Sequence, residues 1–241
     1  MCTVTFLPGR NGFRLAMNRD ELRTRVRALP AALHLRDGLG LLQPREPGGG
    51  TWISANPHGA VLTLLNAYAV AYVPPRPRAS RGTVIPSIDT LADAAAVDAR
   101  LRQDSQRALP PFRLVGFFAR NGEVMEWLWD GHGLRAHAHP WQPGQWSSSA
   151  FDEKRAGVER RILFESALPG LLADPETPLS PLHRGHLPER GPWSVCMHRE
   201  DARTVSLTEV RVDAETVRMT YVDGPPCRTA SGAELVLTRE R

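Results

Sequence analysis

Apolar residues along the first third of the chain fall into short runs separated by turn residues, which is the pattern of antiparallel strands. Residues 3–7 and 13–17 are two such runs, and the turn cluster 9–12 between them contains two glycines. Residues 51–55 and 60–65 form a second pair around Asn-Pro-His-Gly. Both pairs have the spacing of β-hairpins, so we expect a strand-rich start to the fold.

Two helical segments interrupt the later strands. Residues 87–103 carry apolar side chains near helical spacing, and residues 149–168 open with Ser149 and Asp152, which are residues typical of a helix start. A proline-rich crossover is expected at 169–192. The remaining strand candidates are 112–119, 124–129, 134–138, 193–197, 204–210, 216–221 and 234–238.

This order of strands, helix, strands, helix and strands has no internal repeat and no obvious linker. It predicts a single domain over residues 1–241 in the α+β class. A doubly wound fold would alternate strand and helix throughout, and that pattern is absent from the sequence.

Composition and charge narrow the possible partners. The net charge is +4, the basic residues are spread along the chain, and Lys154 is the only lysine. A nucleic-acid surface more often forms a basic cluster, so we expect no nucleic-acid partner. No apolar run approaches the roughly 20 residues that span a bilayer, and no signal-peptide pattern opens the sequence. We therefore expect a cytoplasmic protein without membrane insertion.

The position of Cys2 suggests chemistry. Methionine aminopeptidases remove Met1 when the second residue is small, which would leave Cys2 with a thiol and a free α-amine. An α-amine has a pKa near ~7.7–8.0 and can serve as a base at neutral pH. One residue would then supply both nucleophile and base. The alternative is a small apolar residue that simply begins a strand.

Four consecutive polar residues, Asn18, Arg19, Asp20 and Glu21, follow the apolar run 13–17. If the first two strands pair, these residues lie near Cys2. A carboxylate there could hold the α-amine, and an arginine could lower the pKa of the thiol. The alternative is a helix N-terminus, where acidic residues are favoured by the helix dipole.

Histidines and the remaining cysteines offer metal or haem ligands. His137 and His139 share one strand face, but no third ligand has suitable spacing, so we expect an exposed pair rather than a metal site. Cys196 and His198 are soft ligands that could suit haem or copper, with core packing as the alternative.

The proline-rich crossover carries two further histidines, His183 and His186, which we expect to face solvent. The chain has three cysteines, an odd and small number that argues against a disulfide framework. The sequence predicts no resident metal and no required cofactor.

Several motifs occur together in one order. They are Met1-Cys2-Thr3-Val4, Asn18-Arg19-Asp20-Glu21, Gly48-Gly49-Gly50-Thr51-Trp52-Ile53 and Leu65-Asn66. Over roughly the first 70 residues the chain resembles the NRDE family, also called the transport and Golgi organisation protein 2 family. The resemblance implies the four-layer αββα sandwich of an N-terminal-nucleophile (Ntn) hydrolase, distantly related to penicillin V acylase and bile salt hydrolase.

The same resemblance implies roles for individual residues. Cys2 would be the nucleophile, with Arg19 and Asp20 as its nearest charged partners, and Asn66 would donate to an oxyanion. The substrate-binding residues would be Asn18, Glu21, Gly49, Gly50, Thr51 and Trp52.

Two positions depart from the family pattern. Ser147-Ser148-Ser149 stands where the family has an asparagine before its long helix, and Pro192-Trp193-Ser194-Val195 lacks the arginine of the corresponding run. The functional hypothesis is a cysteine amidohydrolase acting on an acyl amide or related C–N bond. The alternative is a non-catalytic carrier of haem or a lipid-like acyl ligand in the same cleft, because eukaryotic members are linked to haem trafficking and lipid handling.

Overall fold

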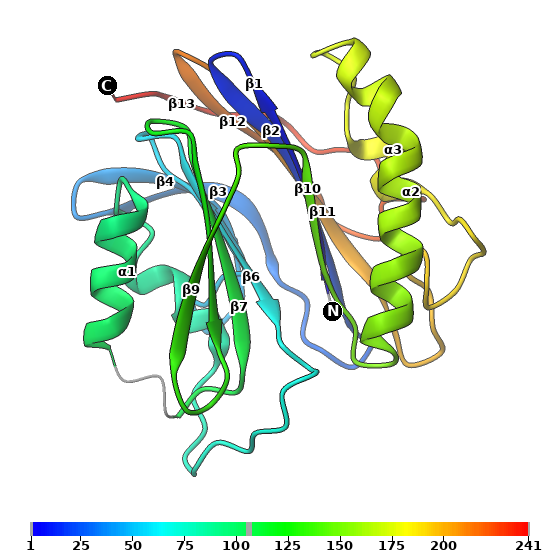
Figure 1. Ribbon diagram of the computed structural model, residues 1–241, viewed down its shortest axis with the longest axis horizontal. Coiled ribbons are helices and arrows are strands. Elements are labelled where there is room, and N and C mark those ends of the chain that lie inside the picture. The colour runs from blue at the N-terminus through cyan, green and yellow to red at the C-terminus, as the bar shows by residue number, and fades with distance from the viewer. Residues whose placement is uncertain (1, 105–107, 241) are drawn as a thin grey trace.

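The computed structural model describes residues 2–104 and 108–240. Two antiparallel sheets face each other (Figure 1). The first has the order β10 (Gly144–Ser148), β1 (Cys2–Gly9), β2 (Gly12–Leu22), β11 (Ala202–Val212), β12 (Thr216–Val222) and β13 (Leu235–Thr238). The second has the order β3 (Leu29–Arg36), β4 (Leu39–Arg45), β5 (Ile53–Ala55), β6 (Ala60–Asn66), β7 (Phe112–Phe118), β8 (Glu123–Trp129) and β9 (Leu134–His139).

Aromatic side chains fill the space between the two sheets. Phe6 of the first sheet stacks on Phe117 of the second with ring centroids 4.8 Å apart, and both are fully buried. Phe13 and Trp146 pack around the same pair. Burial of this apolar area is what holds the two sheets together.

Few helices accompany the sheets. The helix α1 (Ala94–Gln103) packs against the second sheet, whereas α2 (Glu153–Ala173) and α3 (Ser180–Arg184) pack against the first (Figure 1). Short 3₁₀ turns, η1 (Arg81–Thr83) and η2 (Ile85–Ser87), precede α1. No helix in the described ranges is long and apolar enough to cross a bilayer.

Both long helices begin at an aspartate cap. Asp93 accepts a hydrogen bond from the backbone N–H of Ala96, and Asp152 accepts one from that of Arg155. The predicted helix at 87–103 therefore begins only at Ala94, because Asp93 caps it there and residues 88–93 form turns and a bend. The second helix also runs beyond its predicted end, through Pro169 to residue 173.

Several further segments differ from the sequence prediction. The strands β3, β4 and β10 were not predicted, since Pro30, Gly40 and Pro44 weaken the strand pattern in the first two. Residues 193–197, predicted as a strand, form an irregular segment. It lies against the back of the first sheet, where its carbonyls accept hydrogen bonds from side chains.

His183 was expected to face solvent, and that prediction is wrong. Its side chain is completely buried where α3 packs on the first sheet, and its Nε2 lies 2.9 Å from Thr5 Oγ1. Burial, together with the nearby Arg160 charge, lowers the pKa of His183 to about 3.

This buried imidazole should make the fold sensitive to acid. Below pH ~6.5, His183 binds a proton in the unfolded chain but stays neutral in the folded protein. The free energy of unfolding should therefore fall towards pH 3. The contribution of His183 is at most about 1.4 kcal/mol per pH unit. Denaturant unfolding at a series of pH values should therefore show a shallower pH dependence for His183→Gln than for the wild type. His137→Gln on the surface strand β9 is the matched control, and equal slopes for His183→Gln and wild type would contradict this account.

Candidate active site

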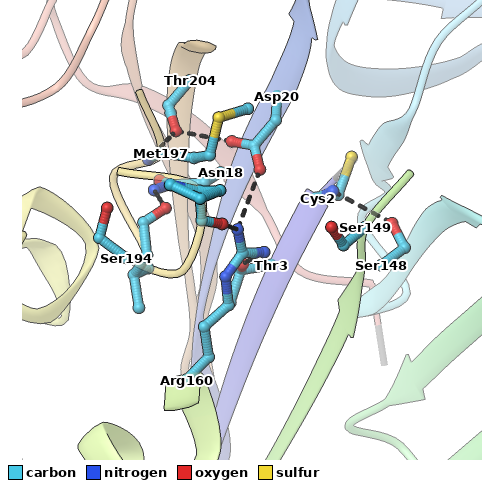
Figure 2. A network of polar contacts seen from close by, with 12 residues as sticks. Cys2, Thr3, Asn18, Asp20, Ser148, Ser149, Arg160, Ser194, Met197 and Thr204 are labelled. Atoms are coloured by element: carbon cyan, nitrogen blue, oxygen red, sulfur yellow. Dashed lines mark hydrogen bonds and ion pairs between the residues drawn. The ribbon is translucent and has the colours of Figure 1, made fainter. Parts of the chain in front are cut away.

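Cys2 begins β1, which lies between β2 and β10. Its cross-strand neighbours are therefore Arg19 on one side and Ser148 on the other. The backbone nitrogen of Cys2 donates to Ser148 Oγ at 3.1 Å (Figure 2). The run Ser147-Ser148-Ser149 thus supplies the contact to the nitrogen that would become the α-amine on removal of Met1.

A cavity of about 620 Å³ opens beside Cys2. Its wall includes seven of the residues singled out from the sequence, namely Cys2, Arg19, Asp20, Glu21, Thr51, Trp52 and Asn66. The wall is completed by charged and polar residues that include Arg25, Glu46, Tyr68, Arg78, Ser80 and Arg81. The β1–β2 hairpin, the end of β6 and the loops around residues 46–52 and 78–82 meet at this point.

Arg19 is held rigidly on the cavity wall. Its guanidinium lies 4.3 Å from the centre of the Trp52 ring, and its Nη2 is 2.8 Å from Glu46 Oε1 and 3.2 Å from Glu21 Oε2. The side chain is almost fully buried, so these contacts leave it little freedom. Two of the predicted substrate-binding residues, Glu21 and Trp52, therefore also orient Arg19.

Burial and the charges around Cys2 act on its thiol in opposite directions. Burial raises the pKa of Cys2, and the negative charge of Asp20 acts in the same direction. The charge of Arg19 and the backbone N–H of Asp20 oppose that shift without reversing it. Arg19 therefore acts on the thiol in the expected direction, but burial is the larger effect and leaves the pKa of Cys2 raised.

Asp20 contributes its carboxylate to the other face of the sheet. Side chains alternate along β2, so Asp20 points away from the face that Arg19 and Cys2 share. Its Oδ1 accepts a hydrogen bond from Thr204 Oγ1 at 2.6 Å, and its Oδ2 is 3.6 Å from Nη2 of Arg160 (Figure 2). The structure thus pairs this carboxylate with a buried arginine.

Arg160 was missed by the sequence analysis. It lies in α2, is completely buried, and donates from Nη1 to Thr3 Oγ1 at 2.8 Å. It also contacts the carbonyls of Trp193 and Pro192, in the run that lacks the family's arginine. A signal was available, because Arg160 stands four residues from Ala156 and from Phe164, which are both buried on one helix face.

Three residues expected at the binding site lie elsewhere. Asn18 is buried on the same face as Asp20, and its Nδ2 donates to the carbonyls of His183 and Val195, each at 2.9 Å. Gly49 has φ of +82° in a turn, and a Cβ on Gly50 would lie 3.1 Å from the backbone of Gly82. Neither glycine borders the cavity. The small size of Gly50 instead allows two loops of the wall to touch, and Gly49 provides the positive φ of the turn.

Asn66 ends β6 and borders the cavity together with Tyr68, whose hydroxyl accepts a hydrogen bond from Asn66 Nδ2. Burial raises the pKa of Tyr68 and lowers that of Arg81. The Nη1 of Arg81 donates to the carbonyl of Pro111 at 3.1 Å. Tyr68 was not singled out, because it lies in an irregular segment without periodicity. Arg81 belongs to the basic, proline-rich run 76–81, which the sequence suggests is a solvated loop.

These charges predict how the reactivity of Cys2 responds to mutation. Arg19→Gln removes a positive charge and should raise the pH at which Cys2 is alkylated, whereas Asp20→Asn should lower it. Iodoacetamide labelling across pH, with the Cys2 peptide quantified by mass spectrometry, measures this shift. Arg25→Gln, which removes a more exposed arginine bound to Glu46, is the matched control. Shifts of Arg19→Gln and Asp20→Asn in the same direction would contradict the electrostatic assignment.

Comparison with known proteins identifies the family. The model of the transport and Golgi organisation 2 family matches residues 1–141. Among curated proteins, no sequence matches the chain. A mutant of conjugated bile acid hydrolase from Clostridium perfringens has a similar structure, with a TM-score of 0.58 and 9% identity over 100% of this chain and 97% of that one.

Penicillin V acylase from Agrobacterium tumefaciens is a second similar structure. Its TM-score is 0.51 and its identity 12%, over 92% of this chain and 83% of that one. Both neighbours are Ntn hydrolases, and at these identities the likeness shows a shared fold. The family match confirms the resemblance seen in the N-terminal motifs: this chain belongs to the transport and Golgi organisation 2 family.

Proposed function

We propose that the chain is an N-terminal-cysteine amidohydrolase that cleaves an acyl amide or a related C–N bond. The observation that carries the proposal is the position of Cys2, on the wall of the cavity with its nitrogen hydrogen-bonded to Ser148 Oγ. The four-layer αββα arrangement of an Ntn hydrolase is part of the same proposal. The general likeness to bile acid hydrolase and penicillin V acylase supports it.

The proposed reaction uses both functional groups of the processed N-terminus. Removal of Met1 leaves an α-amine on Cys2, which takes the thiol proton as Sγ attacks the acyl carbonyl carbon. The C–N bond then breaks as the amine returns that proton to the leaving nitrogen. Water, activated by the same amine, hydrolyses the thioester and releases the acyl group as a carboxylic acid. Ser148 orients the amine through its hydroxyl.

The negative charge of the tetrahedral intermediate needs hydrogen-bond donors. Asn66 Nδ2 borders the same cavity as Cys2, and we assign it this role together with a backbone N–H. Asp20 and Arg160 act as positioning residues in this scheme. Their ion pair fixes the far side of β1 and β2 and does not touch the substrate.

The cavity lining favours a substrate that is polar or anionic. Arg19 and Arg25 are both paired with Glu46, so they contribute little net positive charge. Arg78 and Arg81 also border the cavity, and Arg81 contacts a backbone carbonyl rather than a carboxylate among the described residues. A carboxylate or similar anion on the substrate would complement these two guanidinium groups.

Hydrolysis assays with penicillin V, conjugated bile acids and N-acyl amino acids test the proposal. Cys2→Ala should abolish turnover while leaving the affinity for a cleavable amide nearly unchanged. Asn66→Ala should lower kcat by about 10²–10³. Ser148→Ala should lower kcat more than it raises KM, whereas Ser166→Ala, on the exposed side of α2, is the matched control.

The alternative, a carrier of haem or an acyl ligand, predicts a different outcome. A panel without any Cys2-dependent hydrolysis, combined with stoichiometric haem binding whose Soret spectrum changes in Cys2→Ala, would replace the enzyme by a haem carrier. Binding of acyl chains that is unaffected by Cys2→Ala, again without turnover, would indicate an acyl carrier.

A further inference from the structure

Two imidazoles and two thiols converge on the far side of the first sheet from the cavity. The residues are His186, Cys196, His198 and Cys227, and one ligand atom from each lies within 4.8 Å of all the others. They come from three separate stretches of chain, after α3, before β11 and after β12. None of the four borders the Cys2 cavity. Their approach is therefore a product of the fold and not of a local sequence motif.

Three of the distances between these atoms match those of a tetrahedral zinc centre. Zn–N bonds of about 2.05 Å and Zn–S bonds of about 2.3 Å at tetrahedral angles place two ligand nitrogens about 3.3 Å apart, and a nitrogen and a sulfur about 3.6 Å apart. The Nε2 atoms of His186 and His198 are 3.2 Å apart. The Nε2 of His198 is 3.6 Å from Cys196 Sγ and 3.5 Å from Cys227 Sγ.

Hydrogen bonding alone does not account for this arrangement. An imidazole Nε2 either donates one proton or offers one lone pair, yet Nε2 of His198 faces three ligand atoms at once. Thiols are weak hydrogen-bond donors and gain little from such contacts. A cation among the four atoms would satisfy every one of them.

The backbone fixes the ligands in place. The N–H of Cys196 donates to the carbonyl of Gly185 at 3.1 Å, which joins the segment of Cys196 to that of His186. The N–H of His198 donates to the carbonyl of Gly191 at 3.1 Å. Arg184 donates to the carbonyl of Thr229 at 3.0 Å, which holds the turn that carries Cys227. These hydrogen bonds tie together the segments that carry the four ligands.

We propose that His186, Cys196, His198 and Cys227 bind one Zn²⁺ ion in a closed, structural Cys₂His₂ site. Binding forms two Zn–S and two Zn–N bonds, and the two thiols release their protons to solvent. Two thiolates balance the charge of the ion, and two neutral imidazoles complete the tetrahedron. A set of two sulfur and two nitrogen ligands in this geometry selects zinc over hard cations such as Mg²⁺ or Ca²⁺.

The zinc site would stabilise the segment that packs behind β1, the strand that begins with Cys2. The segment between His186 and His198 supplies the carbonyls of Trp193 and Val195, which accept hydrogen bonds from Arg160 and Asn18. Zinc would tie this segment to the chain after β12. The haem or copper interpretation of Cys196 and His198 gives way to this four-residue site, because the fold adds His186 and Cys227.

Metal analysis of the protein purified under reducing conditions tests the proposal. Inductively coupled plasma mass spectrometry should find one zinc per chain. Chelation of the zinc should lower Tm, and adding Zn²⁺ back should restore it. Titration of the chelated wild type with Co²⁺ should give the visible d–d bands of tetrahedral cobalt and a thiolate-to-cobalt charge-transfer band.

Variants locate the site. Cys227→Ser and His186→Ala should each lose bound zinc and the cobalt spectrum, whereas Cys2→Ala and His137→Ala should keep both. Because the cobalt titration uses the wild type, it decides the question even if a ligand variant fails to fold. A Cys196–Cys227 disulfide in the natively purified protein, stoichiometric copper in place of zinc, or octahedral cobalt bands would each overturn the proposal. So would full zinc content in both ligand variants.

Discussion

The antiparallel pairing of β1 between β2 and β10 is the constraint on which the site depends. It sets Arg19 and Ser148 on either side of Cys2, although Ser148 is 146 residues away in the sequence. Because side chains alternate along a strand, the same pairing sends Cys2 to the cavity and Thr3 to the opposite face. A slip of one residue would exchange these faces and remove the thiol from the cavity.

The opposite face of these strands carries an equally specific arrangement. Asp20 and Arg160 are both withdrawn from water, and their attraction must offset a large loss of hydration. Hydrogen bonds from Thr204 to Asp20 and from Arg160 to Thr3 and backbone carbonyls meet much of that cost. Such a network stabilises one arrangement of β1, β2 and α2 only when every member is satisfied, so we regard it as the element that fixes the geometry behind Cys2.

Local pattern predicted much of the sheet content. The β1–β2 hairpin, the β5–β6 pair and the strands β7, β8 and β9 follow apolar runs bounded by turn residues, and the structure confirms them. The edge strand β10 escaped prediction because its partner, β1, is distant in sequence. The edge strand β3 pairs locally with β4 and escaped because Pro30 weakens its strand pattern. Residues 193–197 have the composition of a strand, yet their backbone carbonyls bind side chains instead of a ladder.

The order of the sequence motifs located the residues of the cavity wall but not Arg160 behind the sheet. Cys2, Arg19, Trp52 and Asn66 belong to motifs in the first third of the chain, and they meet at one cavity. Arg160 belongs to no such motif. The sequence of a helix does not show that one of its arginines is buried, because that burial comes from how the helix packs on the sheet. The same limit applies to the proposed zinc site: Cys196 and His198 stand out as soft ligands in the sequence, but only the fold brings His186 and Cys227 to them.

Trapping of an acyl-enzyme tests the central claim most directly. The processed protein is mixed with an activated acyl ester, quenched at short times, and examined by intact and peptide mass spectrometry. The account predicts a chain that lacks Met1 and carries one acyl group on the sulfur of Cys2, and this group disappears as turnover proceeds. An intact Met1, or acyl groups found only on Cys196 or Cys227 while Cys2 stays unmodified, would contradict it.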